Sequence, residues 1–238
     1  MKLNKQSKII LLSLFLPLIL LSKEINFIEE ESIKKSFIPS FQSGTGSLDY
    51  NNANFQYTTD SPSPRDFDYK LYQPARIRAN KNFTVITELK NSTIPESSKE
   101  LASVGIEIYQ RKNLSNRFAT ELSCARLQGY FSRTVFSQLV EFGEKTSSCY
   151  SEDLRLAEVT TVKIDYIANN KVFYISYLQD EEWIKVGSFG IAGSGGENGN
   201  AQWKIKNNEN LLLYIYGFST NMNVYEGDIQ IKSLKIEK

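Results

Sequence analysis

The chain has 238 residues, of which 41% are hydrophobic and 23% charged, so it can bury a core and is not a wholly disordered chain. Lysine and arginine (28) nearly balance aspartate and glutamate (27), which gives no electrostatic reason to expect nucleic acid as a partner. Histidine is absent, so catalytic triads, Cys-His dyads and histidine metal sites are excluded, and two cysteines cannot form a four-thiolate zinc site. We expect neither a metal ion nor a cofactor.

The N-terminus has the pattern of an export signal. Three lysines precede an apolar run over residues 9–21, which is too short to span a bilayer but fits the core of a signal peptide. We therefore expect a signal peptide over residues 1–22 and an exported protein that is periplasmic, at the cell surface or extracellular. A buried core helix is the alternative. The residues before Ser22 match the usual cleavage pattern poorly, and contact with a membrane is expected only if the signal is uncleaved.

The next stretch, residues 23–46, has the composition of a connector. Three successive glutamates at 29–31 are followed by a mixture of proline, serine and glycine. We expect this connector to be partly disordered or to form a short helix around Ile25–Lys35, whose apolar face is thin. A single β-sandwich domain is expected to follow, over residues 47–238.

From Ser47 onward, short β-like runs alternate with polar turns. Leu48, Tyr50, Phe55 and Tyr57 flank a turn at Asn51-Asn52. The later expected strands are, in chain order, Ala75–Ala79, Phe83–Leu89, Val104–Tyr109, Phe118–Leu127, Tyr130–Phe142, a hairpin within Thr161–Leu178, Trp183–Phe189, Leu211–Phe218 and Asp228–Ile236. About ten strands with one doubtful helix favour an all-β fold, a two-sheet antiparallel β-sandwich, over an alternating βαβ fold.

Local signals predict three irregular positions in these strands. Gln128-Gly129 is a hairpin signal between two runs, and Asn169-Asn170 supplies residues that tolerate the positive φ of a tight turn. In the last run the apolar residues before and after Lys232-Ser233 are out of phase. A β-bulge at that point would bring both sets to the same face.

Export also bears on the two cysteines, Cys124 and Cys149. In an oxidising compartment two cysteines most simply pair, so we expect one intramolecular disulfide. The alternative is a reactive thiol, which would need a lysine or arginine to activate it because the chain has no histidine.

Two long stretches resemble a known family. The run TVKIDYIANNKVFYISYLQDEEWIKVG, residues 161–187, is similar to the paired strands of concanavalin A-like jelly rolls (lectin/glucanase or laminin-G-like), and the run over residues 211–236 is similar to their closing strands. The resemblance covers roughly residues 47–238 and lies at the level of the fold. It implies an exported protein, often one that faces carbohydrate.

Four residues are candidates for ligand binding within this fold. Glu107 and Tyr109 alternate with the apolar residues of one run, and Glu121 and Ser123 do so in the next. In a jelly roll such a face can be the concave, ligand-facing one, where carboxylates accept hydrogen bonds from sugar hydroxyls and aromatic rings stack on sugars. The alternative is a solvated sheet face.

Two further features have open interpretations. Trp183 can be a stacking platform for a ligand, but the core beside its hairpin is the favoured position. The glycine-rich stretch Gly187–Gly199 holds six of the 13 glycines and lacks the spacing of a phosphate or calcium loop. We expect a mobile surface loop there, with a ligand lid as the functional alternative.

These observations favour a binding protein over an enzyme. The related glucanases carry a Glu-x-Asp-x-(x)-Glu string of carboxylates, and no such string occurs here. We expect an exported, non-catalytic module that recognises a glycan or another cell-envelope ligand. The alternative is a structural or assembly protein of the envelope, the surface or a periplasmic filament, whose partner would be an envelope protein.

Overall fold

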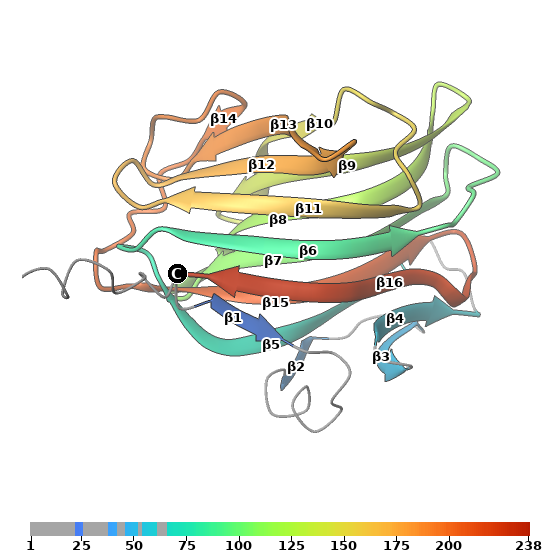
Figure 1. The fold of residues 1–238 in the computed structure, drawn as a ribbon, viewed down its shortest axis with the longest axis horizontal. Helices are drawn as coiled ribbons and strands as arrows, with labels where there is room; N and C mark the ends of the chain where they lie inside the picture. Colours follow the sequence, from blue (N-terminus) through green and yellow to red (C-terminus); the bar gives the residue numbers. More distant parts are fainter. Residues whose placement is uncertain (1–21, 26–37, 42–45, 52–53, 61–65) are drawn as a thin grey trace, which may run out of the picture.

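The computed structural model describes residues 22–25, 38–41, 46–51, 54–60 and 66–238. All regular secondary structure in these residues is β, and the strands form two sheets packed face to face as a sandwich (Figure 1). Among the described residues there is no helix of the length and hydropathy that crossing a bilayer requires.

One sheet has nine strands in the order β14-β13-β12-β11-β6-β16-β4-β3, with β1 also paired to β16. They are β1 (Ser22–Ile25), β3 (Ser47–Asn51), β4 (Asn54–Thr59), β6 (Phe83–Asn91), β11 (Val159–Ile167), β12 (Val172–Gln179), β13 (Glu182–Gly190), β14 (Gly199–Asn200) and β16 (Val224–Glu237). Neighbouring strands are antiparallel except β13 and β14, which are parallel.

The other sheet has seven strands in the order β10-β9-β8-β7-β15-β5-β2, all antiparallel to their neighbours. They are β2 (Ile38–Phe41), β5 (Asp66–Arg78), β7 (Leu101–Gln110), β8 (Asn113–Leu127), β9 (Tyr130–Glu141), β10 (Glu144–Tyr150) and β15 (Asn210–Thr220). The predicted two-sheet antiparallel β-sandwich is therefore confirmed.

The predicted bulge and hairpins are present. The register between β16 and β6 shifts between Ile231 and Ser233, as the change of phase required. Gln128 and Gly129 both have positive φ (52° and 86°) in the turn between β8 and β9. In the β11–β12 hairpin the residue with positive φ is Lys171 (54°), and the two asparagines before it do not adopt that conformation.

Two short strands lie in the stretch predicted to be a connector. β1 pairs with β16 and β2 pairs with β5, so each sheet gains one strand from this part of the chain. Apart from Ile25, which ends β1, the expected helix around residues 25–35 lies outside the described residues. The signal peptide over residues 1–22 also lies outside them, except for Ser22.

Aromatic rings join the two sheets at the centre of the core. Phe118 of the seven-stranded sheet stacks on Phe173 of the nine-stranded sheet, with 4.6 Å between ring centroids and 9° between planes. Tyr166 packs against Phe173, and its hydroxyl donates a 2.9 Å hydrogen bond to the carbonyl of Ala79 at the end of β5. Ile106 is fully buried, as the alternation in β7 predicts.

The predicted disulfide is absent, because both cysteines are free and buried. Cys124 in β8 pairs with Arg133 of β9, whereas Cys149 in β10 pairs with Ser137 on the other side of β9. The two positions are thus separated by a whole strand and by four residues along it, about 13 Å at ~3.3 Å per residue. A disulfide joins Cα atoms no more than ~7 Å apart.

Burial also makes these thiols unreactive. It raises the pKa of Cys149 to about 11, and it raises the pKa of Cys124 although Arg133 acts in the opposite direction. The thiolate is the nucleophile in thiol chemistry, so both cysteines should behave as small apolar residues. The alternative of a reactive thiol finds no support in these environments.

We expect both thiols of the native protein to resist alkylation at pH 8 and to react fully after denaturation. Raising the pKa of Cys149 from 9.0 to about 11 should slow its alkylation about a hundredfold through the lower thiolate fraction alone. Mass spectrometry of protein treated with iodoacetamide measures this, and a synthetic peptide covering residues 144–150 is the control. A disulfide-linked peptide in a non-reducing map would contradict the arrangement of the strands.

Candidate functional site

The four predicted residues of β7 and β8 lie together on the outer face of the seven-stranded sheet. Glu107, Tyr109, Glu121 and Ser123 alternate with the core residues of their strands, as predicted. All four are buried, with exposed fractions of 4%, 7%, 4% and 7%. This part of the face is therefore not the solvated surface that was the alternative, and its role in ligand binding stays a prediction.

Glu107 is the centre of one polar cluster on this face. Its carboxylate accepts a 2.7 Å hydrogen bond from the hydroxyl of Tyr109 and lies 3.3 Å from Nε of Arg117 in β8. The ring of Tyr214, which is opposite Glu107 in β15, packs edge-on against Tyr109 at 5.1 Å. A buried carboxylate needs such donors, because an unpaired one would be costly.

Glu121 forms the second cluster with Tyr216. These residues belong to β8 and β15, and both are opposite Gly105 in β7, the strand between them. A Cβ atom on Gly105 would lie only 2.8 Å from the Cβ of Glu121. Because Gly105 has no side chain, the hydroxyl of Tyr216 reaches across β7 and donates a hydrogen bond to the Glu121 carboxylate.

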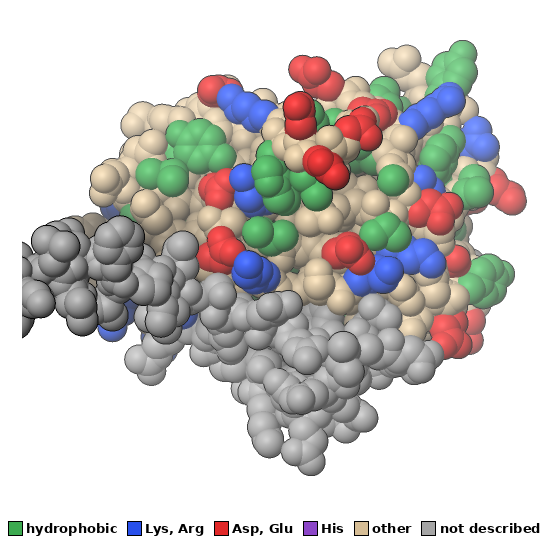
Figure 2. Space-filling view, viewed as in Figure 1, with side chains coloured by type: hydrophobic (Ala, Val, Ile, Leu, Met, Phe, Trp, Pro, Cys, Tyr) green, Lys and Arg blue, Asp and Glu red, His purple; other side chains and the backbone are tan. Residues whose placement is uncertain are grey.

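Trp183 lies far from these clusters, on β13 of the other sheet. Its ring is 40% exposed and lies under the ammonium of Lys163, 4.5 Å from the ring centroid. The favoured prediction that it packs in the core is therefore wrong. The outward face of this sheet carries both acidic and basic side chains (Figure 2). The structure thus brings four of the five predicted residues together and leaves Trp183 apart.

Two adjoining hollows lie at the end of three neighbouring strands of the seven-stranded sheet. β5 ends at Arg78, β7 ends at Gln110, and β15 begins at Asn210 (the left end in Figure 1). One hollow, of about 240 Å³, is lined by Arg78, Asn80, Asn208 and Asn210. The other, of about 440 Å³, is lined by Arg111, Lys112, Asn208, Glu209 and Asn210. Asn208 and Asn210 line both, so the two hollows share a wall.

Glu209 holds together the loops around these hollows through hydrogen bonds. It is only 5% exposed, and its two carboxylate oxygens accept backbone N–H bonds from Lys112 and Lys206, each 3.3 Å long. Its own carbonyl accepts the N–H of Ala79 at 3.0 Å. Through its carboxylate and its backbone carbonyl, this one buried residue therefore ties together the turn after β7, the turn after β5 and the loop before β15.

The exposed side chains that line the hollows are cationic groups and amides. Arg78, Arg111, Lys112, Asn80 and Asn208 are all exposed. Guanidinium, ammonium and amide groups can donate hydrogen bonds to hydroxyl, carboxylate or sulfate oxygens. Sequence reasoning missed this site, because its residues come from three turns that only the sheet brings together.

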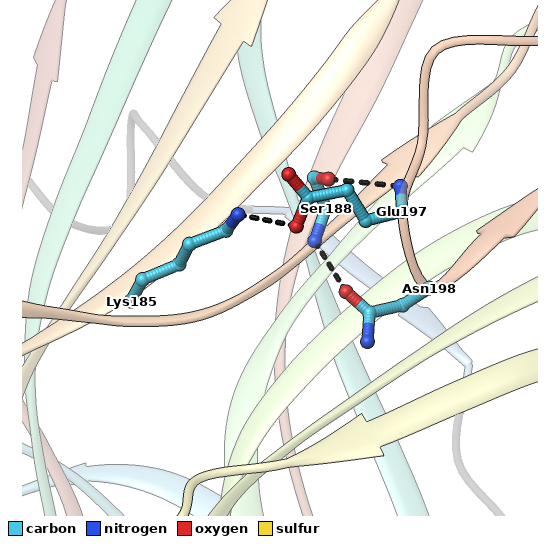
Figure 3. Close-up of polar contacts among 4 residues, drawn as sticks. All are labelled: Lys185, Ser188, Glu197 and Asn198. Atoms are coloured by element: carbon cyan, nitrogen blue, oxygen red, sulfur yellow. Dashed lines mark hydrogen bonds and ion pairs between the residues drawn. The ribbon is translucent and has the colours of Figure 1, made fainter.

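The glycine-rich stretch is a strand and a fastened loop. Gly187 and the three residues after it belong to β13, and the loop behind them is held by side chains (Figure 3). The ammonium of Lys185 pairs with Glu197, the N–H of Glu197 donates to Oγ of Ser188 at 3.1 Å, and the N–H of Ser188 donates to Oδ1 of Asn198 at 2.8 Å. These contacts favour a fixed loop over the mobile one that was expected.

No protein-family model matches the sequence, and no curated protein matches it by sequence. The fold, however, is similar to lectin structures.

Among the described residues no group of three or more metal-binding side chains gathers at one place.

The metal-free lectin I-B4 from Griffonia simplicifolia superposes with a TM-score of 0.55 at 8% identity, over 90% of this chain and 98% of that one. A legume lectin-like domain from Entamoeba histolytica gives 0.52 at 10% identity, over 90% and 95%. The carbohydrate recognition domain of Emp47p gives 0.53 at 10% identity, over 91% and 94%. The predicted resemblance to concanavalin A-like jelly rolls is thus confirmed for the fold.

We expect Glu107→Gln to lower the free energy of unfolding by about 1–3 kcal/mol, because it removes a buried charge that accepts a bond from Tyr109 and pairs with Arg117. Urea unfolding monitored by circular dichroism measures this. Glu152→Gln, at an exposed position, is the control and should change stability by no more than about 0.5 kcal/mol.

Ile106→Ala tests the opposite face of the same strand. It should cost ~2–5 kcal/mol as a large-to-small change in the core. A variant that melts at the parent temperature would contradict the register of β7.

Proposed function

We propose that this protein is an exported, non-catalytic module that binds glycans at the two hollows beside β7. The observation that carries the proposal is the pair of hollows with a shared wall, lined by amide and cationic side chains. They lie at one end of the seven-stranded sheet, in a chain whose fold is similar to that of lectins. The larger hollow, about 440 Å³, falls within the size range of small-ligand sites, and the smaller one, about 240 Å³, lies just below it. Amides suit sugars because each can donate to one hydroxyl and accept from another.

Two observations support binding without catalysis. The chain lacks both histidine and the Glu-x-Asp-x-(x)-Glu string of the related glucanases. The two carboxylates of the predicted ligand-binding face, Glu107 and Glu121, are buried and accept hydrogen bonds from tyrosine hydroxyls. They serve the sheet as hydrogen-bond acceptors.

Export rests on the lysine-rich start and the apolar run over residues 9–21. N-terminal sequencing of protein from the native host tests it, and we expect a mature chain that begins near residue 23. Recovery of an intact Met1 start on soluble cytoplasmic protein would overturn export while leaving glycan binding untouched.

Asn208→Ala should weaken glycan binding about fivefold to tenfold, because it removes roughly one hydrogen bond to the ligand. A glycan array identifies the ligand, and calorimetry on the parent and variant measures the change in affinity. Asn207→Ala is the matched control, since this neighbouring asparagine is exposed but lines neither hollow.

A blank array would overturn glycan binding. If a protein of the cell envelope copurified with the chain at the same time, the result would favour the structural or assembly role. If Asn208→Ala lowers the affinity for the glycan no more than Asn207→Ala does, the ligand lies outside the hollows.

A further inference from the structure

The two hollows beside β7 are flanked by positive charge on both sides. Arg78 lines one hollow, and Arg111 and Lys112 line the other. Asn208 and Asn210 form the wall between them. A ligand that crosses this wall therefore meets a cation at each end and amides in the middle.

Among the residues that the structure describes, Glu209 is the one carboxylate that lines either hollow, and it does not neutralise these cations by direct pairing. Both oxygens of Glu209 accept backbone N–H bonds, and its side chain is buried within the loops. None of the side chains of Arg78, Arg111 and Lys112 forms an ion pair with any residue that the structure describes. Their hydrogen-bonding groups are consequently available to a ligand.

Elsewhere in the described chain, several exposed or half-buried lysines do have acidic partners. Lys163 pairs with Asp165 at 3.2 Å, and Lys235 pairs with Glu237 at 2.7 Å. With a nearly neutral chain, an excess of cations at one place is a local feature and does not follow from composition. Its coincidence with the two hollows points to the charge of the ligand.

We infer that the hollows bind an acidic saccharide, one that carries carboxylate or sulfate groups. A guanidinium binds a carboxylate or sulfate through two parallel hydrogen bonds, so Arg78 and Arg111 can each hold one acidic group. The asparagine amides can then bind the hydroxyls of the sugar rings. This inference rests on the proposed function and names the ligand class for the same site.

The test compares matched ligands on the full mature chain. The probes are a uronic acid oligosaccharide with its carboxyl-reduced form, and a sulfated oligosaccharide with its desulfated form. We expect at least one acidic member to bind about tenfold or more tightly than its neutral partner, with an affinity that falls as salt is raised. The pair that shows the difference distinguishes carboxylate from sulfate.

Arg111→Gln should reduce binding of the preferred acidic ligand about tenfold and change binding of the neutral partner little. Arg78→Gln should act in the same direction from the other hollow. The matched control is Lys99→Gln, which removes one exposed positive charge in the turn before β7, at the opposite end of that strand. This control should bind as the parent does.

The outcomes separate the inference from the proposed function. Equal affinity for acidic and neutral partners, or acidic binding that Arg111→Gln leaves unchanged, would overturn the inference and leave glycan binding intact. Failure to bind any saccharide would overturn both. If polyglutamate binds as tightly as the acidic saccharide and Arg111→Gln lowers both affinities equally, the site is a general anion site and the assignment of a saccharide ligand is overturned.

Discussion

The stacking of Phe118 on Phe173 is the contact on which the rest of the structure depends. It joins β8 of one sheet to β12 of the other at the centre of the core. Because side chains alternate along a strand, fixing Phe118 inward also fixes Arg117, Glu121 and Ser123 outward. A slip of one residue would bury the wrong set, so the register of the core and the position of the polar face are one constraint.

Local patterns in the sequence predicted the strands, the Gln128-Gly129 hairpin and the bulge near Ser233, because each of these depends on residues that are close together in the chain. The predictions about pairing were less successful. The strands fix Cys124 and Cys149 on opposite sides of β9 and four positions out of step, and no local pattern carries that register. Trp183 was misplaced for the same reason, since the neighbour that holds its ring, Lys163, comes from a strand two places away in the sheet.

Strand β7 carries residues of the polar face and leads into the turn that lines one hollow. Glu107 and its partner Tyr109 lie near the end of β7. Arg111, which lines one hollow, follows two residues after Tyr109. Buried hydrogen-bonded pairs such as Tyr216 and Glu121 cost stability if one partner is removed, so they hold the strands at defined positions. We interpret this network as the rigid support that sets the spacing of the three turns around the hollows.

The near neutrality of the chain determines how such a site can discriminate. With 28 cations and 27 anions overall, the protein has little net field to draw a charged ligand from a distance. At physiological ionic strength the Debye length is about 8 Å, so the cations at the hollows act mainly on groups that reach them. In the proposed site, recognition of charge would then depend on direct contact with Arg78 and Arg111, whose planar donors require an acidic group in a particular orientation. A site of this kind can select a rigid acidic sugar over a flexible polyanion of the same charge, because only the former presents its acidic groups and hydroxyls at a fixed spacing.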